Sequence, residues 1–354
     1  MNTQFSGTIG WLGVAGLVLL GAMLLHLVVR KLGGWRRNYR RARSELSLIW
    51  HAWSDPVIVQ IRYRRRLRFL TTTLKDSNCW FEAGLALEHA AATGHGITPY
   101  AVALSPRRVG VLVAGPVADH SPPGDPWQAD SDDPRLWWIE RDELLSLTAP
   151  AAQAVEAEAP LLVCLGVDSS GGYAVLLDLL AGPASLSVFG DESTARSTVQ
   201  ALAAQLDARL PVASVEVASG IHQRHAGTSL AEAVRRPGVW FAVGAEQLQF
   251  DPPAGVRLIS LGPAHGTTTL LEAREGFALR LHTGPDWLRI DQQPLARAVA
   301  RAVRWLPEHD FQRAAHAVEV DEADDFADDL PTITGISAVV PADAGAERKV
   351  DAWN

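Results

Sequence analysis

Residues 185–206 read SLSVFGDESTARSTVQALAAQL. The stretch overlaps a short apolar run at 184–189, which has the composition of a buried strand, and the segment 191–208, which has apolar residues at the spacing of an amphipathic helix. A strand that passes through a tight turn into a helix is the repeating unit of α/β proteins. This stretch therefore predicts that strands and helices also alternate on either side of it.

Short β-rich runs alternate with helical patterns around this stretch. Strands are predicted at 161–167, 173–179, 212–217, 239–243 and 257–261, with a helix around 229–235. The alternation predicts an α/β layer with a partly parallel sheet. Antiparallel signals follow, with runs at 269–273 and 278–282 flanking a turn, a strand at 287–290 and a final helix at 294–306.

Nearer the N-terminus, residues 44–92 have a helical pattern. The pair Asp55-Pro56 is expected to interrupt it, because the residue before a proline disfavours the helical conformation. A helix at 78–93 is followed by a hairpin of 100–104 and 109–113, a loop at 116–133 and a strand at 136–139. The predicted fold class is α/β (or α+β): one N-terminal transmembrane helix followed by a mixed α/β cytoplasmic body.

Changes in composition divide the chain into seven segments. They are a short extracytoplasmic N-terminus (1–8), a transmembrane helix (9–29), a basic juxtamembrane helical segment (30–76), a small α/β domain (77–148), a linker (149–160), a degenerate P-loop-like α/β domain (161–306) and an acidic tail expected to be disordered (307–354).

The predicted transmembrane helix is the uncharged run IGWLGVAGLVLLGAMLLHLVV, 9–29. About twenty apolar residues are needed for a helix to cross a bilayer. A cleaved signal peptide is the alternative, but its basic residues would precede the apolar run, whereas 1–8 carries no charge. Basic residues follow the run, so the positive-inside rule predicts a single-pass protein of the cell membrane with its N-terminus outside and its body in the cytoplasm.

The basic residues just after the apolar run have two interpretations. The first is attraction to anionic lipid, as expected of a polybasic stretch beside a membrane helix. Aromatic rings between the arginines also fit a nucleic-acid patch, but lipid accounts for the same residues without a second ligand. We therefore expect anionic lipid to be bound through Arg36, Arg37, Arg40, Arg41 and Arg43.

The turn within 185–206 has the spacing of a phosphate-binding loop. Gly190, four residues and then Ala195-Arg196-Ser197 match the frame G-x-x-x-x-G-K-[ST], with Ala for the second Gly and Arg for Lys. In a nucleotide-binding protein, Gly190, Arg196, Ser197 and Thr198 would contact ATP or GTP with magnesium. Of the last three positions of the frame, only the hydroxyl residue is retained, as Ser197.

Two further features oppose nucleotide chemistry. Asp191 and Glu192 would place carboxylates where phosphate charge should lie, and the predicted strand at 239–243 ends in Gly244-Ala245-Glu246 rather than in a magnesium-binding carboxylate. The competing interpretation is a structural strand, turn and helix in which Asp191 or Ser193 caps the helix. On this interpretation no cofactor and no catalytic residue are expected.

The other reactive residue types form no site by their spacing. Cys79 and Cys164 lie in apolar surroundings without further cysteines at metal-ligand spacing, and His222 and His225 have no third ligand. Hydrophobic residues make up 47% of the chain and charged residues 20%, which indicates a globular protein. Acidic residues crowd one part of the C-terminal segment, namely Glu319, Asp321, Glu322, Asp324, Asp325, Asp328 and Asp329.

Four stretches resemble the degenerate P-loop, FtsK-like cytoplasmic module of membrane-anchored actinobacterial proteins, some of which carry LysM or transcriptional-activator-type domains. The stretches are SNCWFEAGLALEHAAATG with TPYAVALSPRRVGVLVAGP (77–116), RLWWIERDEL (135–144), GVDSSGGYAVLLDLLAGPASLSVFGDESTARSTVQALAAQL (166–206) and EAREGFALRLHTGPDWLRID (272–291). The resemblance implies a core that kept its strand-turn-helix geometry and lost nucleotide chemistry. No LysM or activator domain is visible in this chain.

These observations favour a membrane-tethered cytoplasmic scaffold or adaptor that docks a protein partner at the inner face of the membrane without catalysis. One alternative is a nucleotide-binding membrane protein, an NTPase or a sensor, that uses a divergent P-loop. A second is a DNA-associated membrane protein that uses the basic segment; its affinity would fall steeply with salt.

Overall fold

The structure is a computed structural model of the full chain. It describes residues 16–309 except 18, 25, 29, 31–34, 93–95, 116–121, 123, 148–158, 223–227, 247, 249, 251, 264–266 and 286–287, and it describes only the backbone of 35–54. The described chain divides into two compact units, Met1–Arg64 and Arg65–Asn354. Each unit is treated by itself below.

The first unit is helical at its described positions. Residues 16–30 are helical wherever they are described, and helix α2 (Trp35–Lys75) starts in this unit and continues into the second. Among the described residues, no helix has both the length and the apolar character needed to cross a membrane. Part of the predicted span 9–29, including 9–15, lies outside those residues.

The predicted interruption at Asp55-Pro56 is wrong, because Pro56 lies inside α2. A proline within a helix removes one backbone hydrogen bond and kinks the helix, but it does not have to end it. The break falls instead at Asp76, whose side chain accepts a hydrogen bond from Asn78 N at 3.0 Å while its carbonyl accepts one from Cys79 N at 3.1 Å. These bonds start the next helix, α3 (Ser77–Ala92).

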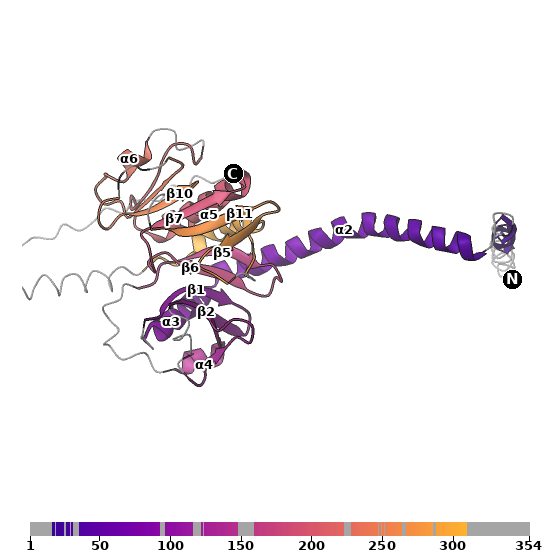
Figure 1. The fold of residues 1–354 in the computed structure, drawn as a ribbon, viewed down its shortest axis with the longest axis horizontal. Helices are drawn as coiled ribbons and strands as arrows, with labels where there is room; N and C mark the ends of the chain where they lie inside the picture. The colour runs from indigo at the N-terminus through magenta and orange to yellow at the C-terminus, as the bar shows by residue number, and fades with distance from the viewer. Residues whose placement is uncertain are drawn as a thin grey trace, which may run out of the picture. The chain divides into compact units, whose positions relative to one another are not determined.

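The second unit contains one sheet of 13 strands in the described part of the chain, in the order β3-β4-β2-β1-β6-β5-β13-β12-β11-β7-β10-β9-β8. Figure 1 labels β2, β1, β6, β5, β11, β7 and β10 of this sheet. The strands are β1 (Thr98–Leu104), β2 (Arg108–Ala114), β3 (Gln128–Ala129), β4 (Leu136–Glu140), β5 (Leu162–Asp168), β6 (Ala174–Asp178), β7 (Ser185–Gly190), β8 (Val215–Val217), β9 (Phe241–Gly244), β10 (Arg257–Leu261), β11 (Thr269–Arg274), β12 (Ala278–Leu281) and β13 (Ile290–Asp291).

The sheet has two halves of different character. Strands β1 to β6 pair only antiparallel with one another. In the other half, β8, β9, β10, β7 and β11 pair in parallel, and β12 then pairs antiparallel with β11. The two-residue strand β13 joins the halves by pairing with β12 on one side and β5 on the other. This confirms a mixed α/β fold with a partly parallel sheet.

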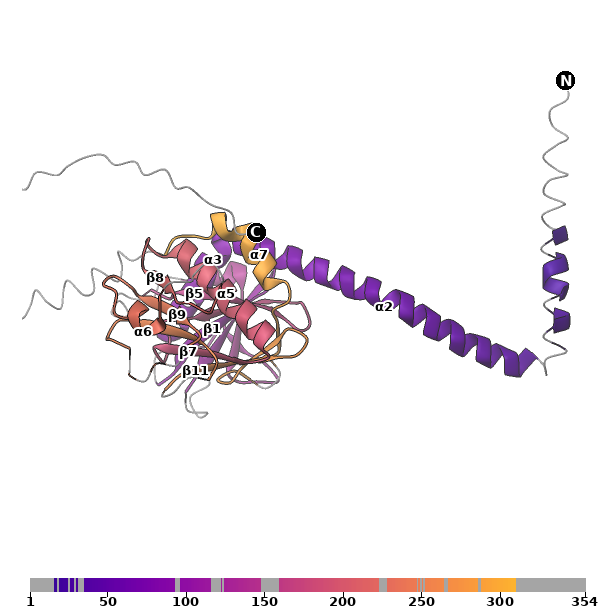
Figure 2. The ribbon, with the colours of Figure 1, turned by 90° about the horizontal axis from the view of Figure 1, so that it is seen from above.

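Helices cover the sheet. They are α3, α4 (Arg141–Ser146), α5 (Glu192–Arg209), α6 (Leu230–Ala233) and α7 (Leu295–Ala302), the last continuing into the 3-10 turn η3 (Val303–Trp305). Helix α3 packs on β1 and β2, while α5 packs on β5, β7, β10 and β11 with α7 beside it (Figure 2). The last part of α2 is built into this unit, because Leu67, Leu70 and Leu74 are buried.

One hydrophobic core crosses the predicted domain boundary. Its cluster contains Ala101 and Leu112 from the first predicted α/β section together with Leu186, Leu202 and Ile259 from the second. Strand β1 also pairs directly with β6. The predicted linker 149–160 therefore does not divide the sheet; its residues 149–158 lie outside the described part of the chain.

Candidate functional site

The strand-turn-helix that the sequence singled out is present as β7 and α5. Helix α5 begins at Glu192, directly after its N-cap residue Asp191. The Asp191 carboxylate accepts hydrogen bonds from Thr194 N at 2.9 Å and from Ser193 Oγ at 2.8 Å, and these bonds lower its pKa. The capping interpretation is confirmed, with Asp191 as the cap.

The four residues proposed for nucleotide binding do not surround a loop. Gly190 ends β7, whereas Arg196, Ser197 and Thr198 lie within α5, in its second turn. The Thr198 side chain is buried and donates to Thr194 O at 2.7 Å, so its hydroxyl is already engaged. A phosphate cradle needs successive backbone N–H groups pointing into a loop, and here the Asp191 carboxylate occupies that position.

Gly190 has a packing role at this site. Its φ is +110°, and a Cβ built on it would lie 2.0 Å from the carbonyl oxygen of Ala273 on the neighbouring strand β11. The next residue, Asp191, donates its backbone N–H to the same Ala273 oxygen at 2.8 Å. Glycine is therefore required for close approach of two strands, which is a different reason from the one that the phosphate-loop frame suggests.

Arg196 is engaged by its own protein. Its guanidinium donates to Gly220 O, in the turn after β8, and to Glu192 Oε1 at 3.0 Å. After β9, the Glu246 carboxylate accepts from Leu230 N at 3.2 Å, at the start of α6. Both charged side chains at this edge of the sheet thus bind neighbouring loops and helix ends, and the carboxylates of Asp191 and Glu192 would repel a phosphate.

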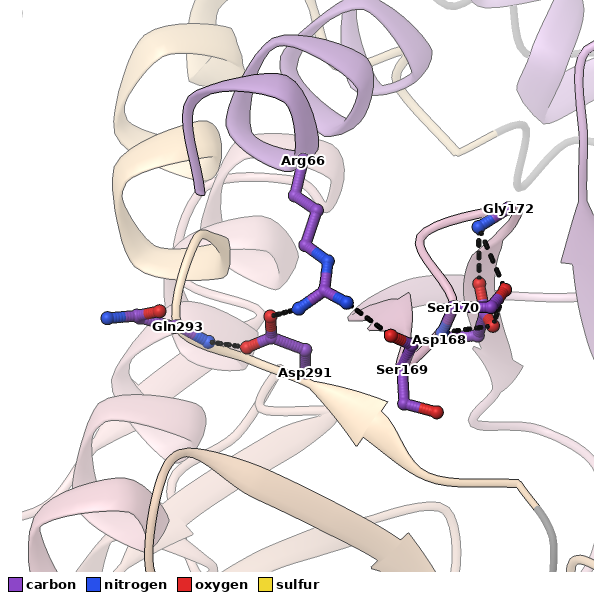
Figure 3. Close-up of polar contacts among 7 residues, drawn as sticks. All are labelled: Arg66, Asp168, Ser169, Ser170, Gly172, Asp291 and Gln293. Atoms are coloured by element: carbon purple, nitrogen blue, oxygen red, sulfur yellow. Dashed lines mark hydrogen bonds and ion pairs between the residues drawn. The ribbon is translucent and has the colours of Figure 1, made fainter. Parts of the chain in front are cut away.

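A second polar cluster lies where α2 enters the second unit (Figure 3). Arg66 donates to the Asp291 carboxylate and to Ser169 O, and the same carboxylate accepts from Gln293 N at 3.0 Å. Asp291 is in β13, and Gln293 lies just before α7. One arginine therefore connects α2 to the strand that joins the two halves of the sheet and to the β5–β6 turn.

The β5–β6 turn is organised by the buried carboxylate of Asp168. It accepts hydrogen bonds from Ser170 N at 2.8 Å and Gly172 N at 2.7 Å (Figure 3). It also accepts one from Tyr173 N at 2.9 Å. The sequence predicted this turn but not its contact with Arg66, which was grouped with the basic juxtamembrane residues. The apolar spacing of Leu67, Leu70 and Leu74 indicates that this part of the helix packs against the body, but it does not specify the partner of Arg66.

Comparisons with protein-family models, with curated proteins and with solved structures found no match to this chain.

The surroundings of the two cysteine thiols, Cys79 and Cys164, favour a structural role. Cys164 is fully buried in β5, and burial raises its pKa to about 12. Burial also raises the pKa of Cys79, which contacts Arg141 Nη2 through Sγ at 3.1 Å. A thiol with a raised pKa is a poor nucleophile at neutral pH because the thiolate is the reactive form. Within the described ranges no group of three or more His, Cys, Asp or Glu could hold a metal ion, and His225 lies outside those ranges.

Proposed function

We propose that this protein is a membrane-tethered scaffold whose cytoplasmic body docks a protein partner. The observation that carries the proposal is the exposed apolar surface of the N-terminal helical residues. Leu17, Leu19, Leu20 and Met23 are 64–77% exposed. Exposed apolar side chains in continuous sequence mark a surface that lipid or another partner covers. The uncharged run 9–29 and the arginines after it favour lipid.

The last part of α2 supports a scaffold role. This part belongs to the second unit, where Leu67, Leu70 and Leu74 are buried. The Arg66 contacts with Asp291 and Ser169 add charged hydrogen bonds at the same place. The end of α2 is therefore held in the second unit by core packing and by charged hydrogen bonds.

The docking part of the proposal rests on two exposed apolar side chains of neighbouring helices. Phe81 on α3 is 63% exposed and Leu145 on α4 is 53% exposed. The two helices contact one another, and Arg141 at the start of α4 forms an ion pair with Glu82 of α3. Aromatic side chains on a fixed surface are the residue type that most often anchors a protein partner.

The membrane part is tested by replacing two apolar residues of the run with charge. Each aspartate placed near the centre of a spanning helix costs about 3 kcal/mol of insertion free energy. We expect the full chain to stay in the membrane fraction after an alkaline carbonate wash, and the variant Leu20→Asp/Leu24→Asp to appear in the soluble fraction. The matched control Val212→Asp/Phe277→Asp changes two exposed apolar residues of the body and should stay with membranes. A full chain that is washed off by carbonate contradicts the proposal.

A further inference from the structure

Exposed arginines gather on two neighbouring elements of the second unit. They form what we call the basic face: Arg65 and Arg68 on α2, Arg297 and Arg301 on α7, and Arg304 in η3. None of the five has an ion-pair partner among the residues that the structure describes. Exposed cations that lie near one another repel, and the repulsion is relieved by an anionic partner.

Two contacts, one at each end, hold the two elements next to each other. Arg66 of α2 binds Asp291, four residues before α7 begins (Figure 3). At the other end, Lys75 Nζ of α2 lies 3.8 Å from the centroid of the Trp305 ring in η3. The last part of α2 and the segment from α7 to η3 are therefore neighbours, and their arginines belong to one region of the surface.

The chain leaves the described body from this same region. Arg209, which is buried, donates through Nε to Pro307 O at 3.0 Å, and its own carbonyl accepts from His309 N at 2.9 Å. His309 is the last described residue, four positions after Trp305. Whatever follows His309 in the sequence thus starts beside the basic face. Glu308 contributes one carboxylate at the exit.

The sequence that follows is the most acidic part of the chain. Seven carboxylates occur from 319 to 329: Glu319, Asp321, Glu322, Asp324, Asp325, Asp328 and Asp329. Ten positions separate His309 from Glu319. Ten extended residues span at most about 35 Å. The two ends of the basic face are closer than that to the exit, since eleven residues of helix from Arg65 to Lys75 extend over only about 15 Å.

We propose that the acidic segment 319–329 docks on the basic face of its own chain. The charges are complementary, and the covalent connection gives the segment an effective concentration of about a millimolar at this surface. Anionic lipid is the competing occupant, and its phosphates have the same charge. The tail is favoured because it is attached beside these arginines, whereas the arginines expected to bind lipid, Arg36 to Arg43, are a different set.

The lysine content of the chain makes a direct test possible. The sequence has three lysines, Lys31, Lys75 and Lys349, so Lys75 is the sole lysine of the described residues and lies beside the basic face. A carbodiimide couples a carboxylate to a lysine amine only when the two are in contact. The full chain in phosphatidylcholine nanodiscs would be treated with carbodiimide, digested and analysed by mass spectrometry.

We expect a cross-link between Lys75 and a carboxylate of 319–329 within one chain. Raising sodium chloride from 0.05 to 0.5 M should lower its yield about fivefold, because the Debye length falls below the spacing of the charges. Replacing the seven acidic residues of 319–329 with Asn or Gln should slow the carbodiimide reaction of the Lys75 amine. The variant Asp343→Asn/Glu347→Gln/Asp351→Asn removes acids outside the segment and should leave the 319–329 cross-link unchanged.

A second measurement does not depend on cross-linking. Glutamate-specific protease cleaves after Glu319 and Glu322, and docking should slow this cleavage. The variant Arg65→Gln/Arg68→Gln/Arg297→Gln/Arg301→Gln/Arg304→Gln should speed it severalfold, whereas Arg107→Gln/Arg108→Gln, at the exposed β1–β2 turn, should not. Equal rates of cleavage in the unsubstituted chain and in both arginine variants would overturn the proposal. A Lys75 cross-link that forms only between two isotopically distinct chains would overturn it as well. The absence of any cross-link between Lys75 and 319–329 in phosphatidylcholine nanodiscs also overturns it.

Discussion

Gly190 shows at the residue scale how one glycine can fit two explanations. In the phosphate-loop frame it is the first glycine, needed so that a loop can approach an anion. In the structure its missing side chain lets the Ala273 oxygen of β11 come within the space that a Cβ would fill. The two explanations differ in what a single methyl group would do to the folded state, and a second glycine provides the comparison.

Replacing Gly190 with alanine should be much more damaging than the same change at Gly182. Both glycines have positive φ, +110° and +83°, so alanine adds backbone strain of about 1–2 kcal/mol at either position. At Gly182 nothing lies within 4 Å of a built Cβ, whereas at Gly190 the Cβ would meet a carbonyl oxygen at 2.0 Å. We expect Gly190→Ala to lower the free energy of unfolding by more than about 3 kcal/mol in total. Urea denaturation of the full chain in detergent measures the free energy of unfolding of both variants. Similar losses for the two variants would contradict the packing role.

At the element scale, strand β5 depends on side chains of helix α5. On the side away from β6, its neighbour β13 reaches only Val167 and Asp168. The backbone of Cys164 is satisfied instead by Gln205, whose Oε1 accepts from Cys164 N at 2.8 Å and whose Nε2 donates to Cys164 O at 3.0 Å. Arg209, one helical turn later, donates to Leu162 O. A buried amide thus performs the hydrogen bonding of a strand at this edge.

Substituting Gln205 should loosen the contact between α5 and β5. Gln205→Leu keeps the approximate volume but leaves Cys164 N and O unpaired in the core, at about 1–3 kcal/mol for each group. We expect a total loss of about 2–5 kcal/mol in unfolding free energy and faster hydrogen exchange at the Cys164 amide. Gln200→Leu is the matched control: Gln200 is half-buried on the same helix and donates to Ile221 O at 2.8 Å, so it should leave the Cys164 amide protected. Unchanged exchange in Gln205→Leu would refute this role.

The elements were predictable from sequence wherever a local pattern determines them. The hairpin of β1 and β2, the strand at 257–261 and helix α5 were all expected, because alternation, apolar spacing and the Asp191 cap are local signals. Pro56 was misjudged because a long helix retains its other hydrogen bonds around one proline. The pairing of β5 with α5 through Gln205 could not be predicted, since nothing near residue 164 or 205 specifies a partner 41 positions away.

The candidate site shows the same division between local and long-range information. The sequence favoured a helix cap at Asp191 or Ser193 over a phosphate loop on the basis of charge and residue type, and the structure confirms a cap, at Asp191. The sequence did not predict the contact of Arg66 with Asp291, because that contact joins residues 225 positions apart and depends on the whole sheet. Contacts of this kind require the tertiary fold, and motif spacing does not encode them.

At the scale of the whole molecule, the two predicted α/β sections share strands and core. The register of β1 on β6 places Ala101 opposite Leu177 and Ala103 opposite Val175, and these four residues belong to one hydrophobic cluster. Separating the sections would expose the edge of β1 and one face of its apolar side chains. Exposed edges of this kind lead to aggregation.

The sections should therefore fold together even when the chain between them is cut. We expect a protease site introduced within 148–158 to be cleaved without separating the fragments, which should co-elute in gel filtration with the thermal transition of the uncut protein nearly retained. Residues 65–147 expressed alone should be insoluble, because β1 lacks β6 and the core lacks Leu177, Leu186 and Ile259. Uncut protein with the same inserted site is the control for the insertion. Soluble 65–147 with dispersed amide resonances would instead establish an independent domain, and the shared sheet would then be a docking interface between two folded parts.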